Sequence, residues 1–276
     1  MNRKIVEQLR LELSAGSIEL PLLPEVAQKV IAMTSNENCD ASQLSTLIHR
    51  DQSLAGNILK ITNSANYAGN VKIVSLQQAI ARLGINLLRE IALAVSVQNS
   101  LFNVPGQEKT INYLWKHSLA SSAYAKEIAR SRRKNVESSY LCGLLHTIGK
   151  PIVLKSLHEI CKKEKVKLPL EDSLKILEEE HKVMSLRLAK EWDLPEQVMQ
   201  SVEFFDDYEN CDNFEDEVCT VVLAHILADD LLEHENTEEL NLADHALIDL
   251  LNMYPEDVEE LLSKKEKILE LISSMG

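Results

Sequence analysis

Residues 87–97, Leu-Leu-Arg-Glu-Ile-Ala-Leu-Ala-Val-Ser-Val, form a strongly apolar stretch that begins shortly after Gly84. Glycine often stands just beyond the end of a helix, so we expect one helix to end at Gly84 and the next to cover residues 87–97. The helix before Gly84 has its own start signal, because Ser75 and Gln78 have the spacing of a capping box. These signals predict two successive helices in this part of the chain.

The helical period continues over nearly the whole sequence. In the first helix, apolar residues recur at i, i+4 and i+8, namely at Ile5, Leu9 and Leu13. Further helix starts are predicted at Pro24, at Asp40 with Gln43, and at Asp51. Beyond them we expect helices over residues 110–131, 137–147, 171–192, 195–205, 215–233 and 242–251, one that begins at Pro151, and a final one that begins at Pro255. We find no strand pair and no hairpin signal in the sequence, so the predicted fold class is all-α.

Charge and cysteine content limit the classes of partner and compartment. The chain has 276 residues and a formal net charge of −14, which argues against nucleic acid and anionic membrane, because both need a basic face. Five scattered cysteines without a C-x-x-C pair are typical of reduced thiols. No signal-peptide core and no apolar run of membrane-spanning length is found. We therefore expect a soluble, cytoplasmic protein.

A series of short motifs gives residues 19–205 a family resemblance. In chain order they are Leu20-Pro21-Leu22-Leu23-Pro24, His49-Arg50-Asp51-Gln52-Ser53-Leu54, Asn63-Ser64-Ala65, Ser75-Leu76-Gln77-Gln78-Ala79-Ile80, Leu114-Trp115-Lys116-His117-Ser118, Gly143-Leu144-Leu145-His146 and Trp192-Asp193-Leu194-Pro195. Together they resemble the HDOD family, the HD-related output domains of bacterial signalling proteins. Gln52 departs from the family pattern, which usually has proline at this position.

The resemblance implies an all-α fold with two packed helical subdomains. We expect an N-terminal helix in residues 1–18, an N-terminal helical subdomain in residues 19–105, and a degenerate HD-like helical bundle with C-terminal helices in residues 106–276. The stretch Asn103-Val104-Pro105-Gly106-Gln107 breaks helix locally and fits the boundary between the two subdomains.

The resemblance also implies where a metal ion would bind. Active HD enzymes use a first histidine, an adjacent His-Asp pair and a late aspartate. By position, these ligands correspond to His117, His146 and Asp229, with Asp230 as the alternative for the last. His181 and His225 are further candidate contributors, and His225 and Asp229 are one helical turn apart, hence on one face.

Two positions depart from the enzymes' ligand pattern. In the segment Gly143-Leu144-Leu145-His146-Thr147-Ile148-Gly149-Lys150, Thr147 stands where the aspartate belongs, and a neutral hydroxyl is a poor ligand for such ions. Phe204-Phe205 occupies the position of a His-His pair and is expected to pack over the old pocket. We therefore expect no cofactor, with one divalent ion (iron, manganese or zinc) as the open alternative.

The function implied is a non-catalytic regulatory or scaffolding module in bacterial signal transduction, which meets signalling proteins in trans. Two alternatives remain open at this point. One is a metal-dependent phosphohydrolase with a reduced ligand set, acting on a nucleotide or phosphodiester. The other is a sensor that binds a cyclic dinucleotide or another nucleotide without cleaving it.

Overall fold

The computed structural model describes residues 3–16, 18–34, 41–64, 67, 72–232, 242 and 245–275, apart from the side chains of residues 33, 34 and 41–43. Within these ranges every regular element is a helix and none is a strand, which confirms the all-α prediction. None of the described helices is long and apolar enough to cross a lipid bilayer.

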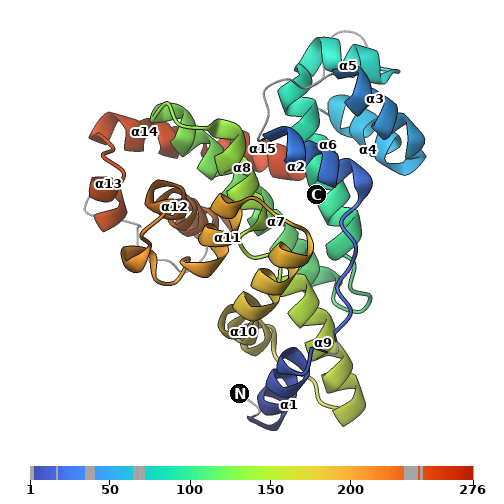
Figure 1. Ribbon diagram of the computed structural model, residues 1–276, viewed down its shortest axis with the longest axis vertical. Helices are drawn as coiled ribbons and strands as arrows, with labels where there is room; N and C mark the ends of the chain where they lie inside the picture. Colours follow the sequence, from blue (N-terminus) through green and yellow to red (C-terminus); the bar gives the residue numbers. More distant parts are fainter. Residues whose placement is uncertain are drawn as a thin grey trace.

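The N-terminal helices gather around one apolar helix, α6 (Ile85–Leu101), which contains the stretch 87–97. Helices α2 (Glu25–Thr34), α3 (Ala41–Arg50), α4 (Gln52–Thr62) and α5 (Leu76–Leu83) all pack against it. Residues on every side of α6 are buried, as expected for a helix that its neighbours surround. In Figure 1 this group lies at the upper right of the molecule.

The predicted caps of this half are present where the structure describes them. The Asp51 side chain accepts a hydrogen bond from Leu54 N, and the Ser75 side chain accepts one from Gln78 N. Gln78 Oε1 in turn accepts from Val74 N at 2.8 Å. Pro24 precedes α2 rather than opening it, because the helix begins at Glu25. The predicted start at Asp40 lies outside the described residues.

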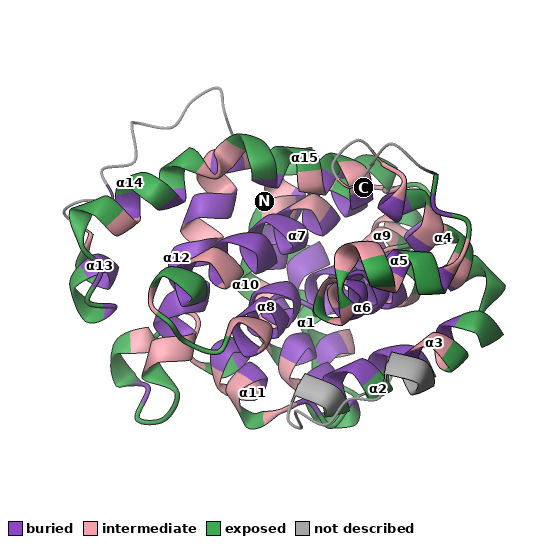
Figure 2. Ribbon diagram, turned by 90° about the horizontal axis from the view of Figure 1, so that it is seen from above, coloured by how far each residue is buried: buried purple, intermediate pink, exposed green. Residues whose placement is uncertain are grey.

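The second half is built around α7 (Glu108–Ser131), which packs closely on α8 (Val136–Leu145) and α12 (Glu215–Leu232). Helices α9 (Lys150–Glu164), α10 (Leu170–Glu191) and α11 (Glu196–Glu203) complete the bundle, followed by a short 3-10 turn, η1 (Tyr208–Asn210). Figure 2 shows buried residues concentrated on α7, α8 and α12, and these three helices carry the site described below.

The C-terminal end differs in detail from the prediction. The helix expected over residues 242–251 is shorter, α13 (Ala246–Leu250), with residues 243 and 244 outside the described part. The single final helix that we expected from Pro255 is two helices, α14 (Pro255–Ser263) and α15 (Lys265–Met275). The break at Lys264 lets α15 pack on α7, where the Trp115 indole Nε1 donates to Met275 O at 3.2 Å.

The two halves are joined by half-buried polar contacts as well as by apolar packing. Lys126 of α7 donates to both carboxylate oxygens of Glu90 on α6, at 2.7 and 2.5 Å. Tyr140 of α8 also donates to Glu90 O at 3.3 Å. Helix α1 (Arg3–Ser14) packs on α9 and α10. It lies at the opposite end of the molecule from α3, α4 and α5 (Figure 1). The residue boundaries of the subdomains stay a prediction.

Candidate metal centre

The site is formed where α7, α8 and α12 meet. His117 lies on α7, His146 follows the last turn of α8, and His225 and Asp229 lie one turn apart on α12. The close approach of α7 and α8 depends on Gly143, because a Cβ atom there would lie 2.8 Å from Ser121 O. Three segments that are far apart in sequence thereby bring their histidines together.

The three histidines lie close enough to share one ion. His117, His146 and His225 each offer a ring nitrogen, and these nitrogens all lie within 4.8 Å of one another. Asp229 adds a carboxylate, with Oδ1 2.9 Å from His117 Nε2 and Oδ2 3.2 Å from His225 Nε2. Asp229 therefore contacts the cluster, whereas Asp230 pairs with Lys265 at 3.2 Å and is directed elsewhere.

The hydrogen bonds of His146 define its tautomer. Its Nδ1 lies 2.8 Å from Gly143 O, and a carbonyl oxygen can only accept, so Nδ1 carries the proton. Burial lowers the pKa of His146 well below its usual value, and the ring is therefore neutral. Its Nε2 lone pair faces the cluster, where it accepts from His225 Nδ1 at 2.9 Å. A backbone carbonyl on one ring nitrogen is a common arrangement for a histidine that binds metal through the other.

His117 has an incompletely satisfied nitrogen. Its Nε2 is buried and has no hydrogen-bond partner of good geometry, although Asp229 lies at ion-pair distance. Burial lowers the pKa of His117 to about 4, and the nearby carboxylate only partly opposes this effect. For Asp229, burial works against ionisation, but the contacts with His117 and His225 outweigh it and lower its pKa. The centre thus combines the neutral imidazoles of His117 and His146 with one ionised carboxylate.

One aromatic ring, that of Phe205, contacts two histidines of the cluster. The Phe205 ring centroid lies 5.1 Å from that of His146 and 4.7 Å from that of His225. Phe205 is half-buried, and its ring meets the two imidazoles at angles of 42° and 61°. Thr147 is buried next to His146 in the chain and provides no carboxylate to the site. Of the two departures from the enzymes' pattern that the resemblance implies, the Phe205 ring contacts this centre, and Thr147 adjoins His146 in the chain.

His181 does not belong to the cluster of three histidines. It lies on α10, where its Nδ1 is 3.2 Å from Ser185 Oγ and its Nε2 is 4.0 Å from Glu178 Oε2. Lys150, at the start of α9, is buried and pairs with the same Glu178 carboxylate. This buried lysine was not predicted from the sequence, because lysine is almost always a surface residue.

The buried histidines predict that stability falls on acidification. His117, His146 and His181 have pKa values below those of an unfolded chain, so the unfolded state binds more protons below pH 6.5. In chelator-treated protein, we expect the free energy of unfolding to fall between pH 7 and pH 4. Each histidine contributes up to about 1.4 kcal/mol per pH unit.

Denaturant unfolding at pH 7 and pH 5 measures this dependence. His181→Gln removes one titrating group, and the pH dependence of the variant should be weaker by up to one proton. An unchanged dependence in His181→Gln would show that His181 titrates normally in the folded state.

Comparison with known proteins identifies the family of the chain. The family model described as HDOD domain matches residues 20–208, well over half of the chain. The chain belongs to the HDOD family. The resemblance expected from the motifs of residues 19–205 is thereby confirmed.

A curated relative of this HDOD chain is known from Treponema pallidum. It is an uncharacterized protein, 25% identical over 195 residues, which make up 67% of this chain and 37% of the relative. The HDOD chain thus corresponds to well under half the length of that relative.

Solved structures share the fold over nearly the full HDOD chain. An HDOD domain protein of unknown function from Geobacter sulfurreducens has a TM-score of 0.75 at 22% identity, with 99% of this chain and 98% of that chain covered. A protein of Shewanella amazonensis, provisionally described as a metal-dependent phosphohydrolase, has a TM-score of 0.70 at 21% identity, with coverage of 99% and 98%. One from Marinobacter aquaeolei, provisionally described as a signal transduction protein, has a TM-score of 0.67 at 21% identity, with coverage of 100% and 66%. At these identities the likeness concerns the fold alone.

Proposed function

We propose that this HDOD protein is a non-catalytic regulatory module, which acts in a signalling pathway through contacts with other proteins in trans. The observation that carries the proposal is the arrangement of the histidine cluster. Its donors contact one another and Asp229, the Phe205 ring lies over two of them, and Thr147 replaces the carboxylate of active relatives. The provisional description of the Marinobacter aquaeolei structure as a signal transduction protein agrees with this role.

The residues of the cluster fit one divalent ion. His146 directs a neutral Nε2 lone pair inward, His117 has a buried Nε2 without a well-formed hydrogen bond, and Asp229 is ionised. His117, His146 and His225 would hold the ion, with Asp229 as the fourth ligand; three imidazoles and one carboxylate suit zinc, and also iron or manganese. An ion bound there would supply Lewis-acid polarisation of a phosphoester.

The surrounding residues argue that such an ion would be structural. Asp229 bridges His117 and His225, so it serves to fix the two rings rather than to take up a proton. The Phe205 ring occupies the space beside His146 and His225, and a phosphoester cannot approach the two imidazoles from that side. With no carboxylate at residue 147, a second ion lacks a bridging ligand. The ion would therefore hold α7, α8 and α12 together.

A hydrolysis assay tests the non-catalytic role. Protein loaded in turn with Zn²⁺, Mn²⁺ or Fe²⁺ is incubated with bis(p-nitrophenyl) phosphate, next to the His146→Gln variant. We expect wild type and variant to release nitrophenol at the same background rate. Release by the wild type that disappears in His146→Gln would instead establish a phosphohydrolase with a reduced ligand set.

A further inference from the structure

A second cavity lies at the other end of α9 from Lys150. It has a volume of about 830 Å³ and is formed by the start of α7, the second half of α9, the connection after α9, and the start of α10. This volume is within the usual range of small-molecule pockets. None of the residues of the histidine cluster lines it.

The charge of the pocket is opposite to that of the chain. Four lysines line it, Lys109, Lys162, Lys165 and Lys167, against one acidic residue, Glu108. The whole chain has 43 acidic and 29 basic residues, so a random patch of its surface would be acidic. Within the described part of the chain, none of the four lysines forms an ion pair, although several other lysines do. The cationic charge at the pocket is therefore available for an anion.

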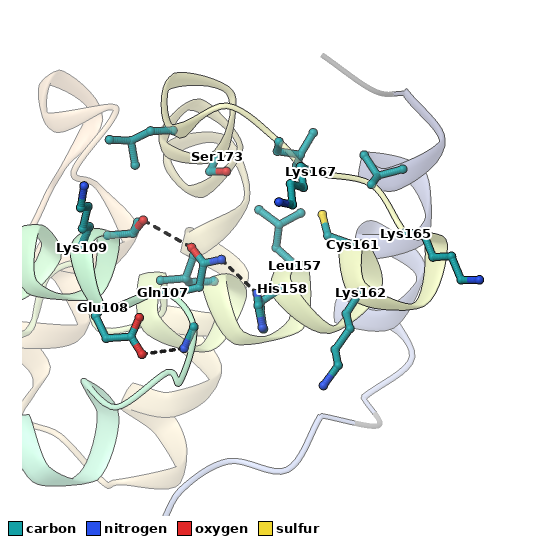
Figure 3. A pocket seen from close by; sticks show the side chains of 16 residues that line it. Gln107, Glu108, Lys109, Leu157, His158, Cys161, Lys162, Lys165, Lys167 and Ser173 are labelled. Atoms are coloured by element: carbon teal, nitrogen blue, oxygen red, sulfur yellow. Dashed lines mark hydrogen bonds between the residues drawn. The ribbon is translucent and has the colours of Figure 1, made fainter.

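The rest of the lining is largely apolar. Leu154 and Leu157 are buried at its floor, Leu168 is half-buried, and Leu170 is 53% exposed at its edge. An exposed leucine beside lysines provides contact area for an apolar or planar group. In Figure 3, Lys167 extends toward the middle of the pocket, whereas Lys165 points away from the other labelled side chains.

Hydrogen bonds fix the polar groups at the centre of the pocket. Gln107 Oε1 accepts from Thr110 Oγ1 at 3.4 Å, which turns its amide nitrogen toward His158 Nδ1 at 3.0 Å (Figure 3). His158 Nδ1 is then an acceptor, so the proton of the ring is on Nε2. Glu108 Oε1 accepts from Gly106 N at 2.8 Å, so this carboxylate is held at the backbone of the loop.

We propose that this pocket binds an organic phosphate of about the size of a nucleotide, with the phosphates at the lysines and the apolar or planar body on the leucines. Four lysines and one acidic residue favour a ligand with two or more negative charges. In small organic ligands such charges are usually carried by phosphate groups. The apolar lining favours an attached ring system over free phosphate. This site is separate from the histidine cluster and does not depend on the proposed function.

Titration with N-methylanthraniloyl-ATP, followed by fluorescence anisotropy, tests the proposal. We expect saturable binding that is weakened about tenfold in Lys167→Glu, by loss of attraction and gain of repulsion. Lys163→Ala is the surface control, because Lys163 is exposed in the last turn of α9 but does not line the pocket. Lys163→Ala should bind as the wild type does.

Three further measurements test the apolar lining, the contribution of the phosphates, and the separation from the histidine cluster. Leu170→Ser, at an exposed position, should weaken binding about threefold, by loss of apolar contact. Pyrophosphate should compete less well than ATP. His225→Ala should bind the probe like the wild type. No saturation up to about 1 mM probe, equal losses in Lys163→Ala and Lys167→Glu, equal competition by pyrophosphate, or loss of binding in His225→Ala would each overturn the proposal.

Discussion

Replacing Gly149 by alanine is expected to destabilise the protein by about 3–5 kcal/mol, the upper end for a single substitution. A Cβ atom at Gly149 would lie 2.5 Å from His181 O and 2.5 Å from Ser185 N, which are both backbone atoms of α10. Backbone atoms within a helix cannot move aside as a side chain does, so α9 and α10 would have to separate. The hydrogen bond from Gly149 N to Ser185 Oγ, 2.9 Å long, would weaken at the same time.

Gly56→Ala provides the matched control for Gly149→Ala. Gly56 lies within α4, and nothing is found within 4 Å of the Cβ position. Alanine favours helix over glycine by up to about 1 kcal/mol, so Gly56→Ala should be neutral or stabilising. Denaturant unfolding of both variants measures the difference. A loss of less than about 1 kcal/mol in Gly149→Ala would show that α9 and α10 are not packed this closely.

Replacing His225 by alanine is expected to weaken zinc binding about 100-fold or more, because one of three imidazole ligands is removed. His225 is the most central residue of the cluster, in contact with His146 at 2.9 Å and with Asp229 at 3.2 Å. Its side chain is 12% exposed, more than those of His117 and His146, so of the three its removal should disturb the packing least. Calorimetric titration of chelator-treated, tag-free protein with Zn²⁺ measures the affinity.

His181→Gln is the control for His225→Ala. His181 is a buried histidine near the same site, but its nitrogens face Ser185 and Glu178 instead of the cluster. Zinc affinity in His181→Gln should remain within a few-fold of the wild type. Zinc at 100 times its dissociation constant should raise the free energy of unfolding of wild type by about 2.7 kcal/mol, and should not do so in His225→Ala. Equal affinity in His225→Ala and wild type would place the ion elsewhere.

The helices were predictable because their signals are local. Ser75 and Asp51 form the caps that their spacing predicts, and Gly84 separates two helices as expected. The break at Lys264 was missed, since no proline or glycine marks it and the helical period continues through the lysine-rich segment. Both α14 and α15 pack on α7, and a single-sequence pattern does not contain such tertiary contacts.

The site was only partly predictable. The resemblance pointed to His117, His146 and Asp229, and the structure brings these three side chains together. It named His181 and His225 as possible contributors, and only His225 lies in the cluster, because α10 directs His181 toward Ser185. The lysines of the second pocket come from α7, α9 and the segment after α9, so only the folded chain shows that they surround one cavity.

The non-catalytic role is tested most directly by phosphodiester cleavage under single-turnover conditions, with metal-loaded protein in excess over a cyclic dinucleotide. Excess protein makes even a slow reaction visible, since turnover and product release no longer limit the signal. The proposed role predicts that wild type forms no more product than His146→Gln or protein-free buffer with the same ion. Product that rises with the concentration of wild-type protein and is absent with His146→Gln would contradict it.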